Sequence, residues 1–87
     1  GEEFVILLRE ATLNEAFTLI DTVREAFFKI SFSSGTRDFN CTFSAGLSAL
    51  TEQGSIEALI NAADVALYQA KSAGRNRVMT DAAASLL

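Results

Sequence analysis

The chain has 87 residues, enough for one domain at most, and a chain of this size hides only about 60–65% of its unfolded surface. Hydrophobic residues make up 49% of it, which is too apolar for a disordered tail. Eleven acidic against seven basic residues give a net charge of −4, which argues against a nucleic-acid partner. No apolar run approaches the roughly 20 residues that span a bilayer, and the lone Cys41 can form no internal disulfide. The sequence therefore predicts a soluble, cytoplasmic protein without a membrane segment.

The first predicted element is the apolar run Phe4–Leu8, which directly follows Glu2 and Glu3. An unbroken run of this kind is typical of a strand that is buried on both faces of a sheet. Such a strand needs a neighbouring strand on each side.

A capping box begins the next element, with Thr12 as N-cap and Glu15 at the third helical position. Apolar residues then recur at spacings of three and four along one helical face: Leu13, Ala16, Phe17, Ile20, Val23 and Phe27. This pattern predicts a helix that packs on the core.

The middle of the chain is predicted to be β structure. From Phe39 to Ala49 apolar and polar residues alternate, which indicates a half-buried antiparallel strand with Cys41 as a small hydrophobe on its apolar face. The turn residues 33–36 would let residues 30–32 pair back on it as a hairpin.

A second helix is expected between Ser55, a suitable N-cap, and Gly74, a residue that can adopt the left-handed conformation closing a helix. Its apolar face consists of Ile56, Leu59, Ile60, Ala63, Leu67 and Ala70. Residues 77–79 should form a short strand at a sheet margin, and residues 80–87 carry no motif.

Three cations surround the predicted end of this helix: Lys71 one turn before Gly74, and Arg75 and Arg77 just beyond it. They could simply complement the negative end of the helix dipole. Alternatively, Lys71 and Arg75 leave adjacent turns and could grip one polyphosphate. The residue pattern alone leaves both interpretations open.

Two stretches of the sequence together resemble the GGDEF domain, the family of diguanylate cyclases. Gly1-Glu2-Glu3-Phe4 is similar to the last four residues of its GG(D/E)EF motif, and residues 63–78 resemble its closing segment, Ala-Asp-x-Ala-Leu-Tyr-x-Ala-Lys-x-x-Gly-Arg-Asn-Arg-Val. The resemblance implies that residues 1–79 form the C-terminal half of such a domain, with residues 80–87 as a tail. The implied fold is α+β, a partial nucleotidyl-cyclase-like fold in which helices pack on a mostly antiparallel sheet in the order strand, helix, hairpin, helix, strand.

The resemblance also implies an enzyme. Family members hold one GTP in each domain of a homodimer and condense two GTP into cyclic di-GMP and pyrophosphate, with Mg²⁺ or Mn²⁺ as cofactor. The 87 residues alone are expected to be inactive. An alternative is a degenerate GGDEF module that binds GTP, or mediates dimerisation and signalling, without catalysis. A third possibility is a plain association domain, because a strand without neighbours exposes pairing edges.

Site residues follow from the resemblance, position by position. Glu2 and Glu3 match the acids of the motif that serve catalysis and hold the metal, whereas without the resemblance they would be a solvated chain terminus. Gly1 matches the glycine at which the backbone approaches the nucleotide. Lys71 and Arg75 match the triphosphate-binding cations, and the Asn76-Arg77 pair is expected to brace the turn into the last strand.

One departure from the family pattern concerns Thr22, which stands where some members place an arginine that binds inhibitory product. Ser44-Ala45-Gly46 resembles the family's Ser-x-Gly strand element. A nucleophilic role for Ser44 is excluded because the chain has no histidine to act as its base.

Overall fold

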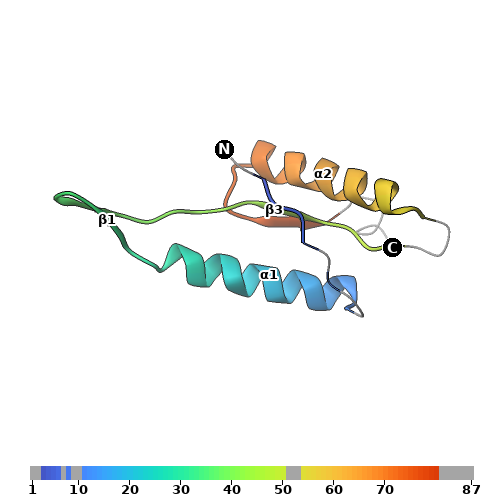
Figure 1. The fold of residues 1–87 in the computed structure, drawn as a ribbon, viewed down its shortest axis with the longest axis horizontal. Coiled ribbons are helices and arrows are strands. Elements are labelled where there is room, and N and C mark those ends of the chain that lie inside the picture. Colours follow the sequence, from blue (N-terminus) through green and yellow to red (C-terminus); the bar gives the residue numbers. More distant parts are fainter. Residues whose placement is uncertain (1–2, 7, 9–10, 51–53, 81–87) are drawn as a thin grey trace.

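The computed structural model describes residues 3–6, 8, 11–50 and 54–80. Its elements are α1 (Leu13–Phe28), β1 (Phe32–Ser34), β2 (Arg37–Phe39), β3 (Ala45–Leu47), α2 (Ile56–Ser72) and β4 (Val78–Thr80). Both helices pack against β3 and β4, and the β1–β2 hairpin projects past the ends of the helices (Figure 1). The molecule is therefore elongated, 53 × 25 × 21 Å. The predicted α+β class is confirmed.

The strands form two small sheets, of which one is antiparallel and the other parallel. β1 and β2 form the predicted antiparallel hairpin, in which Phe32 lies opposite Phe39. Its first strand is Phe32–Ser34 rather than the predicted residues 30–32, so Ser33 and Ser34 belong to the strand and not to the turn. β3 instead pairs in parallel with β4, with Ala45 opposite Val78, so the pairing is mixed rather than mostly antiparallel. None of the helices in the described part of the chain is long and apolar enough to cross a membrane.

The single long strand predicted from Phe39 to Ala49 is wrong, because residues 40–44 separate β2 from β3 and pair with no strand in the described part of the chain. The amide of Asn40 donates hydrogen bonds to the carbonyl oxygens of Phe28 at 2.7 Å and Ile30 at 3.0 Å. This side chain ties the chain back to the end of α1 where a longer hairpin would have continued. Burial follows the alternation at residues 40–43, where Cys41 and Phe43 are half-buried and Asn40 and Thr42 exposed, but residues 44–48 are all half-buried. The pattern also did not indicate which strand each half would pair with.

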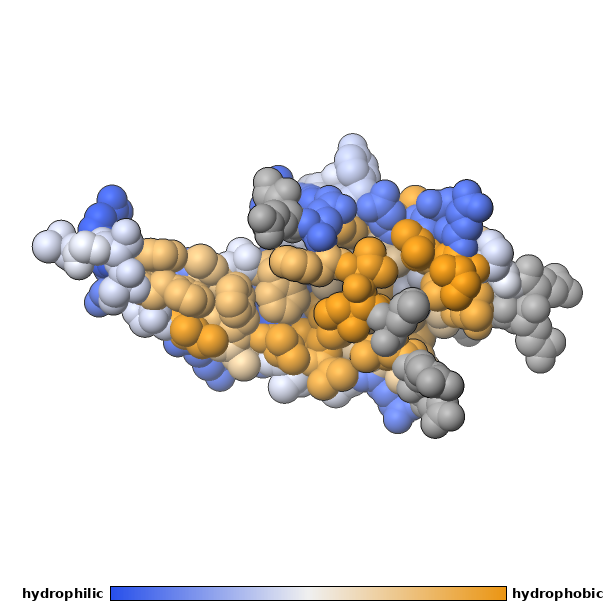
Figure 2. Space-filling model, viewed as in Figure 1, coloured by the Kyte–Doolittle hydropathy of each residue, from blue (hydrophilic) through white to orange (hydrophobic). Residues whose placement is uncertain are grey.

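The predicted buried strand at Phe4–Leu8 is also not formed over its described residues. Phe4, Val5 and Ile6 are exposed at 83%, 71% and 70%, and they pair with none of the described strands. A strand is stabilised by backbone pairing and by cover on its faces, and this segment has neither here. Figure 2 shows the broad apolar surface that results across the centre of the molecule.

Helix α1 begins as predicted. The Thr12 hydroxyl accepts from the Glu15 amide at 3.1 Å, and the Glu15 carboxylate accepts from the Thr12 amide at 3.0 Å. Its apolar stripe is half-buried apart from Val23, which is 46% exposed. At its end Phe27 lies with its ring centroid 5.8 Å from that of Phe32 and 5.7 Å from that of Phe43, so aromatic contacts join the hairpin to the helix.

The core lies where α2 crosses β3 and β4. Ser55 caps α2 by accepting from the Ala58 amide at 3.1 Å, as predicted. Among the residues that the structure describes, those that are buried are Ala66, Ala70 and Val78. Two residues of the predicted apolar face, Ile56 and Ile60, are exposed. The buried Ala66 was not predicted to belong to that face. The face of α2 that packs on the strands is rotated away from the two isoleucines and toward small residues.

Gly46 of β3 sets the distance between strand and helix. A Cβ atom on Gly46 would collide with the Ala63 carbonyl oxygen and the Leu67 amide nitrogen. Both are backbone atoms of α2, which cannot move aside as a flexible side chain can. A residue larger than glycine is therefore incompatible with this packing.

We predict that Gly46→Ala destabilises the protein containing this chain by about 2–3 kcal/mol, because the added methyl forces α2 away from β3. The matched control is Gly35→Ala in the hairpin turn, where the methyl meets nothing within 4 Å and only the positive φ of 66° opposes it. That control should lose about 1 kcal/mol. Equal losses of unfolding free energy in denaturant titrations would contradict the packing argument.

A second prediction concerns the capping box at low pH. The hydrogen bond from the Thr12 backbone, followed by that of its side chain, lowers the pKa of Glu15 below its ordinary value of 4.5. Because the folded-state pKa is depressed, the stabilisation is present above 4.5 and is lost as pH falls through the lowered value. NMR titration of the Glu15 carboxyl should give a midpoint below 4.5, which Thr12→Ala raises. Because alanine keeps the backbone amide, a midpoint unaffected by Thr12→Ala would exclude the contribution of the Thr12 side chain.

Candidate functional site

The first residues of the chain and the end of α2 meet at one ion pair. Glu3 Oε2 lies 3.1 Å from Lys71 Nζ, although the two residues are 68 positions apart. The Lys71 side chain is 36% exposed and that of Glu3 58%. Both charges therefore remain accessible to a ligand from solvent.

This ion pair lies at a shallow depression of about 220 Å³. Its lining residues come from the N-terminal segment and one face of α2: Glu3, Asp64, Leu67, Tyr68 and Lys71. The α2 members are spaced by three, four and seven, so helical periodicity places them together. Tyr68 is 73% exposed at this depression.

Helix α2 ends in a Schellman motif directly beyond Lys71. The Gly74 amide donates to the Lys71 carbonyl at 3.4 Å, and the Arg75 amide donates to the Ala70 carbonyl at 2.9 Å. Gly74 has a φ of 119°, as expected for the predicted stop. Arg75 is exposed, and its guanidinium has no ion-pair partner among the described residues.

The turn continues through Asn76 and Arg77 into β4. The Asn76 amide donates to Ser44 Oγ at 3.1 Å, and Asn76 Oδ1 accepts from Arg24 at 2.9 Å. The Arg77 carbonyl accepts from the Ala45 amide at 3.0 Å. These contacts are of the bracing kind expected for Asn76 and Arg77, and they include Arg24, which the sequence pattern did not single out.

Whether a divalent metal fits at this depression depends on a small number of carboxylate oxygen donors. Gly1 and Glu2 lie outside the described residues, so Glu3 is the described member of the predicted metal pair. Its carboxylate is a hard oxygen donor, and Asp64 lines the same depression. Across residues 3–6, 8, 11–50 and 54–80 no three metal-ligating side chains cluster. Because Mg²⁺ uses one or two carboxylates plus phosphate oxygens, Glu3 fits such a site.

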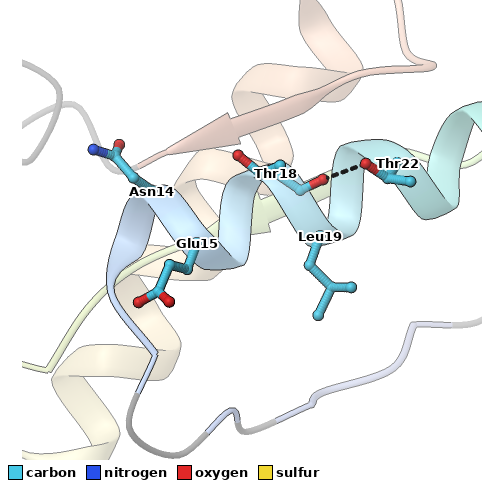
Figure 3. Close-up of a pocket in the computed structure, with 5 residues that line it drawn as sticks. All are labelled: Asn14, Glu15, Thr18, Leu19 and Thr22. Atoms are coloured by element: carbon cyan, nitrogen blue, oxygen red, sulfur yellow. Dashed lines mark hydrogen bonds between the residues drawn. The ribbon is translucent and has the colours of Figure 1, made fainter.

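A larger depression, about 530 Å³, follows α1 and is lined by Asn14, Glu15, Thr18, Leu19 and Thr22 (Figure 3). Among these lining residues Glu15 carries the one charge, and its carboxylate is engaged in the capping box. The Thr22 hydroxyl donates to the Thr18 carbonyl at 2.7 Å. A negative, cation-free lining does not suit a phosphate ligand, so the candidate site is the depression at Lys71.

Comparison with known proteins gives consistent matches. Residues 1–77 match the family described as diguanylate cyclase, GGDEF domain. The chain is 42% identical over 79 residues to diguanylate cyclase DgcM of Escherichia coli K12, which covers 91% of this chain and 18% of that protein. It is 37% identical over 86 residues to response regulator PleD of Caulobacter vibrioides, covering 95% of this chain and 19% of that protein. The chain thus spans about a fifth of the length of these relatives.

We predict that the Glu3–Lys71 pair contributes little to folding. An exposed ion pair contributes only about 0–1 kcal/mol, since solvent screens it and two long side chains lose freedom. Glu3→Gln and Lys71→Met should therefore each change the unfolding free energy by less than about 1 kcal/mol. Denaturant titration checks this. A loss of several kcal/mol would show that the pair is a structural support and would weaken its assignment to a ligand site.

Proposed function

This chain belongs to the GGDEF family of diguanylate cyclase domains, and from that membership we propose that it supplies the metal- and triphosphate-binding part of a GTP site. The observation that carries the proposal is the 3.1 Å contact between Glu3 and Lys71. A carboxylate suited to a divalent cation and an ammonium suited to phosphate lie together there. A metal-bound triphosphate is a ligand that needs both.

The proposed reaction condenses two GTP molecules into cyclic di-GMP. The 3′-oxygen of one GTP forms a bond to the α-phosphorus of the other, and the bond from that phosphorus to the oxygen bridging to the β-phosphate breaks. Pyrophosphate leaves with the electron pair, and the hydroxyl proton passes to solvent. The reciprocal step closes the ring and releases a second pyrophosphate. Because each domain holds one GTP, we propose a homodimer as the active form.

Glu2 and Glu3 are proposed to hold Mg²⁺ or Mn²⁺. Support comes from the exposed, hard oxygen donor of Glu3 at the rim of the depression. When bound, the cation would neutralise charge on the phosphates and polarise the phosphorus under attack. The chain's own contribution is to hold the triphosphate in position with an adjacent carboxylate and its cations.

Lys71 and Arg75 are proposed to bind the triphosphate. In the structure, Lys71 pairs with Glu3. With metal and GTP bound, the carboxylate of Glu3 would hold the metal and the ammonium of Lys71 a phosphate, so each charge would keep an opposite partner. The exchange is easy because an exposed pair is separated at a cost of only about 0–1 kcal/mol. Arg75 adds a planar fork that can take two phosphate oxygens at once.

The competing function is a degenerate module that binds GTP, or associates and signals, without catalysis. Such a module would bind GTP or dimerise without forming cyclic di-GMP, and this difference from the cyclase can be measured. Since GTP is a cytoplasmic metabolite, the cyclase proposal also places the domain in the cytoplasm.

We predict that Glu3→Gln lowers kcat/KM for cyclic di-GMP synthesis at least about 100-fold in the protein containing this chain, because the variant loses a charge that holds the metal. Lys71→Met and Arg75→Ala should mainly raise the KM for GTP, by about tenfold each, since each removes one charge-assisted contact. Product is measured chromatographically, and GTP affinity by calorimetry.

Two controls match these changes in chemistry. Glu57→Gln removes an exposed acid from the first turn of α2, and Lys29→Met removes an exposed base after α1. Both should leave turnover unchanged.

The 87 residues alone should be inactive, because the segment carrying Glu3 has no sheet partner among the described residues. Unchanged turnover in Glu3→Gln would defeat the site assignment, and GTP binding without product by the intact protein would favour the degenerate module.

A further inference from the structure

Arg24 of α1 reaches the turn that joins α2 to β4. Its Nη1 atom donates to Asn76 Oδ1 at 2.9 Å and lies 3.5 Å from the Asn76 carbonyl oxygen. The Nε atom of the same guanidinium donates to Asp21 Oδ1 at 2.8 Å, and the side chain is only 17% exposed. Asp21 therefore holds one edge of the guanidinium while the other edge faces a residue 52 positions later.

Asn76 is held from a second direction as well. Its amide donates to Ser44 Oγ at 3.1 Å, and the carbonyl of the following residue, Arg77, accepts from Ala45. The turn is thus tied to α1 through Arg24 and to the start of β3 through Ser44 and Ala45. Since an arginine can only donate, the side-chain oxygen of Asn76 is the natural partner of Arg24.

The held turn has an unfavourable backbone. Arg75 and Asn76 have φ values of 64° and 48°, in the left-handed region that non-glycine residues rarely adopt. For Arg75 this conformation costs on the order of 1 kcal/mol or more and persists only where its surroundings impose it, whereas asparagine adopts this region more readily than other non-glycine residues. The Arg75 backbone makes two hydrogen bonds of its own, from its amide to the Ala70 carbonyl at 2.9 Å and to its carbonyl from Arg77 Nε at 3.1 Å. Neither bond reaches α1 or β3, whereas the next residue, Asn76, is tied to α1 and to the start of β3. The contacts of Asn76 therefore also maintain the conformation of Arg75.

We propose that Arg24 is a positioning residue for the phosphate-binding turn. By holding Asn76, it sets the direction in which the Arg75 side chain leaves the backbone, and it does so without touching the nucleotide. The phosphate part of this inference rests on the proposed function, whereas the contact between Arg24 and Asn76 does not. Lysine can replace Arg24 only in part, because a single ammonium lacks the fork that serves Asp21 and Asn76 together.

The first experiment needs no nucleotide. In the intact protein, Arg24→Gln should speed NMR-detected hydrogen exchange of the Asn76 amide by about tenfold, since the turn loses a charge-assisted bond. The matched control is Arg37→Gln in β2, an exposed arginine whose guanidinium has no ion-pair partner in the described part of the chain. The exchange rate of the Asn76 amide in Arg24→Lys should lie between the rates in Arg24→Gln and Arg37→Gln. Unchanged Asn76 exchange in a folded Arg24→Gln variant would overturn the claim that Arg24 holds the turn.

The second experiment measures GTP affinity for Arg24→Gln, Arg75→Ala and the double variant. If Arg24 acts through Arg75, Arg24→Gln weakens binding roughly tenfold on its own and adds nothing once Arg75 is removed. A merely structural role would weaken both backgrounds equally, and that additivity would overturn the inference. Faster Asn76 exchange together with no GTP binding by the unmodified protein would instead defeat the proposed function, and with it the phosphate role, while the turn contact stands.

Discussion

The close approach of α2 to β3 is the constraint on which the rest of the described structure depends. Gly46 presents no side chain where the backbone of α2 passes, and Ala66 and Ala70 are fully buried. Small residues on both surfaces let backbone lie against backbone, which leaves α2 little room to shift or rotate. The end of α2 is thereby fixed relative to β3 and β4. This end carries Lys71 and is followed by the turn at residues 74–76. The buried packing between α2 and β3 therefore determines the position of the exposed cations.

The site, as proposed, would bind anions at the end of a helix that is unfavourable for them. The last carbonyls of α2 carry partial negative charge, which repels phosphate unless cations stand nearby. Lys71 in the last turn and Arg75 beyond it provide those cations. Glu3 beside Lys71 partly cancels this charge, so a bare polyphosphate gains less than one that brings its own divalent cation. In the proposed function, this arrangement would favour a metal-complexed nucleotide over a free anion.

Interactions between near neighbours were predictable because their partners are close in sequence. The capping box of Thr12, the Ser55 cap and the Gly74 stop each involve groups within one or two helical turns. The hairpin likewise followed from a short turn between two apolar segments. For the site, the family motifs indicated Glu3 and Lys71 as members of one centre, and the structure places them in contact.

The sequence by itself thus determined where both helices begin, that α2 stops at Gly74, that a hairpin forms before residue 40, and that cations gather at the end of α2. Tertiary structure alone decided which strand β3 pairs with, that Phe4–Ile6 stay unpaired, and that Arg24 reaches Asn76. The physical reason is that a strand or a long-range hydrogen bond exists only when a distant segment supplies its partner. No periodicity within either segment encodes that meeting, which depends on how α2 packs across β3 and directs the chain that follows.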